Sequence, residues 1–163
     1  MISLSNFPIV DYVKAAIIGF FASFLMFVAT APAINFDIAP FNIPPPAAVA
    51  YMLGIGFGPI PWIMHFIYGT FWSCVFVFIW GREGSTFKGI ALGFGLWLLL
   101  MVVYSPLVGW GFFGFGDAHL LPVNHPLYLR EGADFALLSL VIHLVYGGLV
   151  GWLNPLWEQV ETF

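Results

Sequence analysis

Long uncharged segments constrain this chain more than any other feature. No charged residue occurs between Asp37 and Arg82, and only 7% of the 163 residues are charged while 61% are hydrophobic. A soluble domain of this size has no core large enough to hide so much apolar surface. A helix needs about twenty apolar residues to cross the roughly 30 Å of hydrocarbon in a bilayer. The sequence therefore predicts a helical integral membrane protein.

Four segments are long enough to cross. The predicted spans are residues 15–34, 60–80, 87–108 and 134–153. Proline is favoured at helix starts and disfavoured in helix interiors, so the clusters at 44–46 and 59–61 separate a short interfacial or re-entrant helix at residues 46–57 from the second span. Long outer loops follow at residues 38–58 and 109–130. The predicted fold class is an all-α integral membrane domain over residues 1–163, with four transmembrane helices.

The few charges predict orientation and exclude some partners. Lys14, Arg82 and Lys88 fall on one side of the predicted membrane and only Arg130 on the other, which predicts that both termini are cytoplasmic. The expected location is a plasma (inner) or an energy-converting membrane. The net charge of −4 leaves no basic face for nucleic acid. A single cysteine, Cys74, provides neither a disulfide nor a thiolate metal site.

The chain also carries an internal repeat. Lys14-x4-Gly19-Phe20, with Pro32 eighteen residues after Lys14, returns as Lys88-x4-Gly93-Phe94, with Pro106 eighteen after Lys88. Each copy precedes the same string, His65-Phe-Ile-Tyr68-Gly69 and His143-Leu-Val-Tyr146-Gly147. We therefore predict two parallel two-helix units, residues 14–80 and 88–153, related by a two-fold axis along the membrane normal.

The repeat places two histidines, His65 and His143, at similar depths. Three interpretations stay open. The imidazoles can be satisfied within the helix packing, where nearby glycines bring helices together. They can be axial ligands of a haem or a chlorin, with Tyr68 and Tyr146 as outer partners that orient them. They can also form a proton or substrate relay, since ionisable groups inside a membrane are functional candidates by default.

The outer loop at residues 109–130 holds the remaining candidates. Phe112, Phe113 and Phe115 are predicted to contact a partner subunit or interfacial lipid. The nearby polar residues lack metal-ligand spacing, so no metal site is predicted; they are His119, His125, Asp117, Glu131 and Asp134. No catalytic motif is visible, and we predict no enzymatic activity of its own and no catalytic residue.

The residue pattern resembles the YagU-like family of small four-helix membrane proteins, whose function is largely unknown. The matching series are Lys88-Gly89-x3-Gly93-x3-Trp97-Leu98, Pro106-x2-Gly109-x-Gly111-x-Phe113, His143-x2-Tyr146-Gly147 and His65-x2-Tyr68-Gly69. The resemblance covers residues 14–152 and implies four spans. It supplies neither a catalytic residue nor a substrate.

Small size, scarce charge and long outer loops favour an accessory, non-catalytic subunit of a larger membrane complex. An electron-transfer complex, respiratory or photosynthetic, suits the aromatic content of 20%. The expected partners are other integral membrane subunits and lipid. The alternative is a stand-alone protein, working as a homo-oligomer, that binds haem or transports a small solute or protons.

Overall fold

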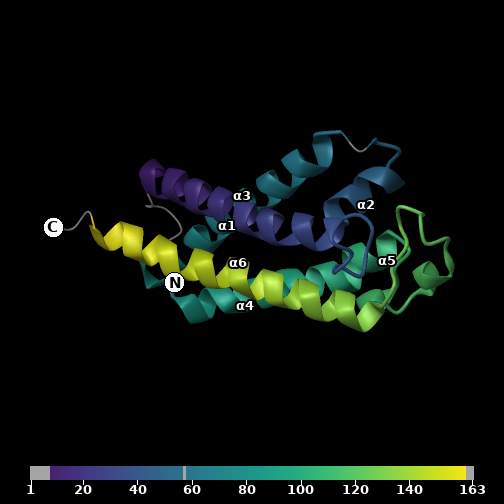
Figure 1. Cartoon of the computed structure of the whole chain (residues 1–163). Coiled ribbons are helices and arrows are strands. Elements are labelled where there is room, and N and C mark those ends of the chain that lie inside the picture. The colour runs from purple at the N-terminus through teal and green to yellow at the C-terminus, as the bar shows by residue number, and fades with distance from the viewer. Residues whose placement is uncertain (1–7, 57, 161–163) are drawn as a thin grey trace.

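The computed structural model describes residues 8–56 and 58–160, and the described chain is mainly helical (Figure 1). The elements in order are α1 (Ile9–Asn35), α2 (Pro45–Met52), α3 (Ile60–Trp80), η1 (Gly81–Glu83), α4 (Thr86–Leu99), η2 (Leu100–Tyr104), α5 (Ser105–Leu107), η3 (Phe112–Gly114), η4 (Asp117–Leu120) and α6 (Gly132–Val160). Four helices are long and apolar enough to cross a membrane: α1, α3, the continuous stretch Thr86–Leu107, and α6. The prediction of an all-helical fold with four helices able to span a membrane is confirmed for the described residues.

Local sequence signals set the helix ends. Proline occupies the first turn of both α2 and α3, where a missing N–H costs nothing. Gly81 ends α3 with a φ of 45°, a conformation that glycine adopts without a Cβ clash. The Ser85 hydroxyl accepts a hydrogen bond from the backbone N–H of Lys88, 3.3 Å away, and so caps α4. The proline at its start and Gly81 at its end give α3 the bounds that the sequence predicted, residues 60 and 80.

Other bounds differ from the prediction. The short helix α2 ends at Met52, whereas it was predicted to reach Phe57, which lies outside the described residues. α1 starts at Ile9, six residues before the predicted span, and includes the charged residues Asp11 and Lys14. α6 runs on at both ends as well. A transmembrane helix can continue past its apolar stretch because its polar ends reach the interface. The positions of charged residues therefore predict the ends of the membrane-crossing stretch better than the ends of the helix.

The spans pack as two antiparallel pairs, α1 with α3 and α4 with α6, and the pairs meet mainly where α1 lies against α6 (Figure 1). Glycines make both contacts close. A methyl group at Gly93 would overlap the carbonyl oxygen of His143, and one at Gly19 would come within 2.8 Å of the carbonyl oxygen of Gly69. Small residues let helix backbones approach in this way. The two-fold relation between the pairs stays a prediction.

The third span contains a π-helical turn, η2, just before Pro106. The backbone N–H of Ser105 donates to the carbonyl oxygen of Leu100, five residues back. Proline has no N–H to donate and its ring crowds the carbonyl of the preceding turn, so the helix relieves the clash by widening. Leu100 begins this turn and Tyr104 ends it.

The two outer connections pack on each other and form a cap over one end of the bundle. Phe41 and Leu129 form an isolated antiparallel bridge, and the backbone N–H of Arg130 donates to Pro40 O at 2.7 Å. The Asn42 amide donates to Val123 O at 2.7 Å. Each connection therefore shields much of the backbone of the other connection.

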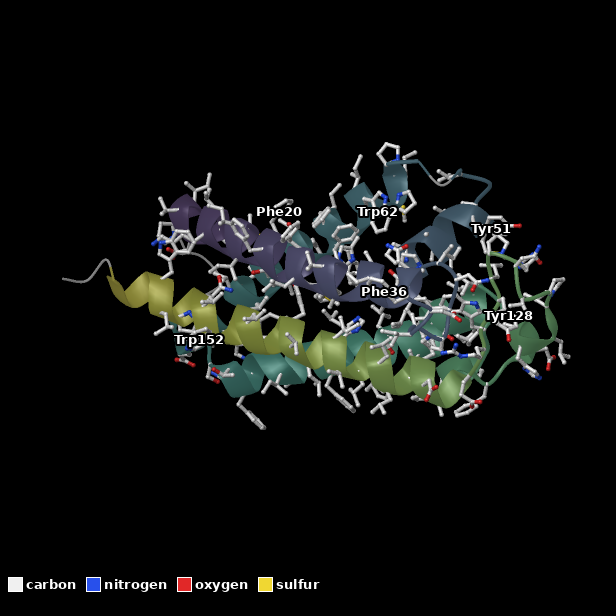
Figure 2. All side chains as sticks on the ribbon, viewed as in Figure 1. Phe20, Phe36, Tyr51, Trp62, Tyr128 and Trp152 are labelled. Carbon is white, nitrogen blue, oxygen red and sulfur yellow. The ribbon has the colours of Figure 1, made fainter. Side chains whose placement is uncertain are left out.

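Two buried clusters stabilise the bundle. One lies beneath the cap, where the ring of Trp110 packs on Phe135, with centroids 5.0 Å apart, and donates its indole N–H to Leu127 O at 2.9 Å. The other lies toward the opposite end and contains Phe76 and Tyr146. Figure 2 shows aromatic side chains along the whole bundle, from Trp152 near one end to Tyr51 and Tyr128 at the cap.

Candidate functional site

A cavity of about 180 Å³ lies among the four spans, next to the cap. The pairs meet through α1 and α6, and the cavity lies between α3 and the third span, which have no comparable contact. Its wall is predominantly apolar, and it includes Phe41 and Pro44 from the connection before α2 and Pro45, Pro46 and Val49 from α2 itself. The lining residues with polar side-chain atoms are Ser23, Thr30, Trp62, His65, Tyr68, Tyr104, Ser139, His143 and Tyr146. All four residues predicted to bind or orient a cofactor thus line one cavity.

His65 reaches from α3 to α1. Its Nε2 lies 2.9 Å from the carbonyl oxygen of Ser23. A carbonyl oxygen only accepts hydrogen bonds, so Nε2 must carry the hydrogen. In the neutral ring the other nitrogen, Nδ1, then holds a lone pair. The Ser23 hydroxyl does not compete for this contact, because it turns back to donate to Gly19 O at 2.8 Å.

His143 is held differently, on its own helix. Its Nδ1 lies 2.7 Å from the carbonyl oxygen of Ser139, one turn back along α6. By the same argument Nδ1 carries the hydrogen and Nε2 holds the lone pair. Both imidazoles are half-buried and line the same cavity. The two histidines therefore use opposite ring nitrogens, and each keeps one nitrogen as an acceptor.

The two predicted tyrosines have different roles. Tyr146 is buried, and its hydroxyl donates to the carbonyl oxygen of Gly69, so it joins α6 to α3. Tyr68 is half-buried, and its ring meets the ring of Tyr104 edge to face, with centroids 6.3 Å apart. The hydrogen-bond partners of the two histidines are the backbone carbonyls of Ser23 and Ser139.

Sequence reasoning missed Tyr104. This residue ends the π-helical turn, and with Leu96 and Leu100 it forms the part of the cavity wall that the third span contributes. π-helical turns are often found at functional sites. Pro106, which the repeat did highlight, was the available signal, since a proline near the end of a span indicates that the helix before it departs from regular geometry.

The three phenylalanines of the outer loop do not form one surface. Phe112 is 63% exposed and Phe115 is 72% exposed. Phe113 turns inward against Trp97, with ring centroids 5.7 Å apart. Only Phe112 and Phe115 are therefore available to a partner or to lipid.

The outer loop histidines lie away from the cavity and have local roles. His119 Nδ1 lies 3.1 Å from Gly116 O, and His125 Nδ1 accepts the backbone N–H of Leu127 at 3.1 Å. Across residues 8–56 and 58–160, no three His, Cys, Asp or Glu side chains come close enough to hold a metal ion together.

The size of the cavity limits what it can hold. An apolar cavity of about 150 Å³ accommodates benzene, so 180 Å³ suits one substituted ring. A haem or chlorin is several times larger than this volume. In comparisons with known proteins, no family model matches this chain, and neither a curated protein nor a solved structure matches it significantly.

Proposed function

We propose that this protein binds a small, mostly apolar ring molecule inside the membrane and does no chemistry of its own. The observation that carries the proposal is the cavity among the four spans, with its apolar wall and its two histidines. Small-molecule sites are typically concave and apolar, with a few polar groups that orient the ligand, and they occur between the helices of bundles.

The free-energy cost of placing two histidines inside the membrane supports a binding role. An imidazole inside a membrane is expensive unless it is paired, and intramembrane ionisable residues are usually functional. Each ring makes one hydrogen bond, to a backbone carbonyl, so one of its two nitrogens has a partner. A ligand that bonds the second nitrogen would satisfy the rest.

Fluorobenzene tests this proposal, because it has the size of the cavity and a ¹⁹F signal. With the protein in lipid nanodiscs, we expect a second ¹⁹F resonance that saturates as the probe-to-lipid ratio rises. Leu138→Trp should abolish it, since Leu138 lines the cavity. Leu137→Trp is the matched control, because Leu137 is 62% exposed on the adjacent position of α6.

The same experiment can refute the proposal. A single ¹⁹F resonance that grows in proportion to the lipid, identical in the wild-type protein and in both variants, would mean that fluorobenzene dissolves in the bilayer and occupies no protein site. The cavity would then be a packing defect, and the histidines would serve the helix packing alone.

A second candidate function is that of an accessory subunit in a larger membrane complex, such as an electron-transfer complex. It is favoured by the exposure of Phe112 and Phe115 on the cap. The outer loops cover each other, so they need no partner for that purpose. Extraction in mild detergent should recover a complex that Phe112→Ser/Phe115→Ser weakens and Phe113→Leu leaves intact. A monodisperse protein without partners would argue against this role.

A further inference from the structure

The second nitrogen of each cavity histidine identifies the kind of ligand. A carbonyl oxygen accepts the hydrogen of His65 Nε2 and of His143 Nδ1, which leaves a lone pair on His65 Nδ1 and on His143 Nε2. Within residues 8–56 and 58–160, no hydrogen-bond donor is paired with either lone pair. Two neutral imidazoles, one on α3 and one on α6, therefore bring acceptors to one cavity, and they favour a ligand that supplies hydrogens.

This requirement separates three kinds of ligand. A quinone offers only carbonyl oxygens, which are acceptors and repel a ring lone pair. A charged amine supplies hydrogens, but a cation in an apolar membrane cavity is expensive. A neutral hydroxyl on an aromatic ring supplies a hydrogen at little cost. Its ring also suits the aromatic wall, where Tyr68 and Tyr104 meet edge to face.

A metal ion is the other partner that a lone pair could bind. Two imidazoles alone give an incomplete ligand set for the common metals. In the described part of the chain no acidic residue or thiol completes such a group. The volume of about 180 Å³ also favours a single ring over a macrocycle.

We propose that the ligand is a hydroxylated aromatic ring of the quinol or phenol class, whose hydroxyl hydrogens are donated to His65 Nδ1 and His143 Nε2. This inference rests on the proposed binding function and makes it specific. It implies that the cavity discriminates between the two redox forms of one ring, because reduction converts the acceptors of a quinone into the donors of a quinol. No electron transfer by the protein is required.

The test compares tetramethylhydroquinone with tetramethylbenzoquinone. The two have nearly the same size, and the four methyl groups prevent addition of the quinone to Cys74. Binding is measured anaerobically on the full chain in lipid nanodiscs, by competition with the saturable fluorobenzene resonance. We expect the quinol to bind about tenfold more tightly than the quinone, which is the usual worth of about one to two hydrogen bonds.

Variants show whether the histidines are responsible. His65→Phe and His143→Phe keep a ring in place and remove the lone pair, so each should weaken quinol binding several-fold and leave quinone binding unchanged or stronger. His119→Phe, in the outer loop, is the control and should change neither. The wild-type comparison of quinol with quinone decides the matter even where a variant does not fold.

Each outcome has a distinct meaning. Fluorobenzene binding with equal affinity for quinol and quinone overturns the inference and leaves the proposed function in place. Absence of a saturable fluorobenzene signal overturns both. A haem absorption band that persists through purification, and disappears in His65→Phe, overturns the single-ring ligand in favour of a macrocycle.

Discussion

The two helix pairs begin from the same sequence pattern and end with different contacts. In the α4–α6 pair, glycines face glycines: methyl groups at Gly89 or Gly147 would overlap backbone carbonyl oxygens on the opposite helix. In the α1–α3 pair, Gly19 faces the backbone of Gly69, but Gly69 itself faces the side chain of Ser23. The second pair is closed by backbone against backbone at both glycines, whereas the first pair includes a side chain that can turn away.

The histidines show the same difference. His65 bonds across to Ser23 O on α1, while His143 bonds back to Ser139 O on its own helix. The position in the second unit that matches Ser23 is Trp97, and its indole N–H donates to Ala136 O on α6 at 3.0 Å. A bulky indole thus stands where the first unit has a small serine, and the hydrogen bond of His143 stays within its own helix. One repeated pattern thus gives two tautomers.

The largest effect should come from the closed pair. We expect Gly147→Ala to destabilise the protein by about 2–3 kcal/mol, because the new methyl group meets backbone that cannot rotate away. Unfolding by SDS in mixed micelles, followed by circular dichroism, gives the free energy. The control is Gly148→Ala, whose methyl group would find only Ile90 at 3.8 Å; equal losses in the two variants would contradict the packing account.

The adjustable pair should tolerate the matching change better. Gly69→Ala would collide with the Ser23 hydroxyl, which can turn away at the loss of its bond to Gly19 O. We expect a loss of about 1.5 kcal/mol in the same assay. Ser23→Ala removes the obstacle, so Ser23→Ala/Gly69→Ala should be more stable than Gly69→Ala. A double variant that is less stable than the single one would show that the two pairs are equally rigid.

The link between the pairs should contribute less. Tyr146→Phe removes the hydroxyl that donates to Gly69 O and leaves the ring in place. We expect a loss of about 1 kcal/mol, typical of a hydrogen bond between membrane helices. Tyr68→Phe serves as the comparison, since the Tyr68 ring is only half-buried. A larger loss of stability in Tyr68→Phe than in Tyr146→Phe would show that Tyr146 is not the tyrosine that links the two pairs.

The smallest effect should come from the cap. Arg130 and Asp37 form an ion pair at 3.7 Å with side chains 44% and 93% exposed. Exposed pairs contribute little, and the backbone bond from Arg130 to Pro40 O survives truncation. Arg130→Ala should therefore change the free energy of unfolding by less than about 0.5 kcal/mol. A loss comparable to that of Gly147→Ala would mean that the cap, and not the helix pairs, holds the bundle together.

The sequence predicted the elements better than their partners. Charge and hydropathy located four spans, and proline and glycine located the bounds of α3, because both signals act through a few neighbouring residues. The packing of Phe41 on Leu129 and the inward turn of Phe113 depend on contacts between distant segments. The repeat singled out His65 and His143, and both line one cavity. Their opposite tautomers could not be predicted, because those depend on which carbonyl each ring reaches.

The tautomers of the two histidines test the central claim most directly. In protein labelled with ¹⁵N histidine and placed in lipid at pH 7, two-bond correlations between ring nitrogens and ring C–H protons report which nitrogen carries hydrogen. His65→Phe identifies the His65 signals by their loss. The structure predicts two neutral rings, with hydrogen on Nε2 of His65 and on Nδ1 of His143. Identical tautomers, or a charged ring at either position, would contradict the account of two lone pairs in one cavity.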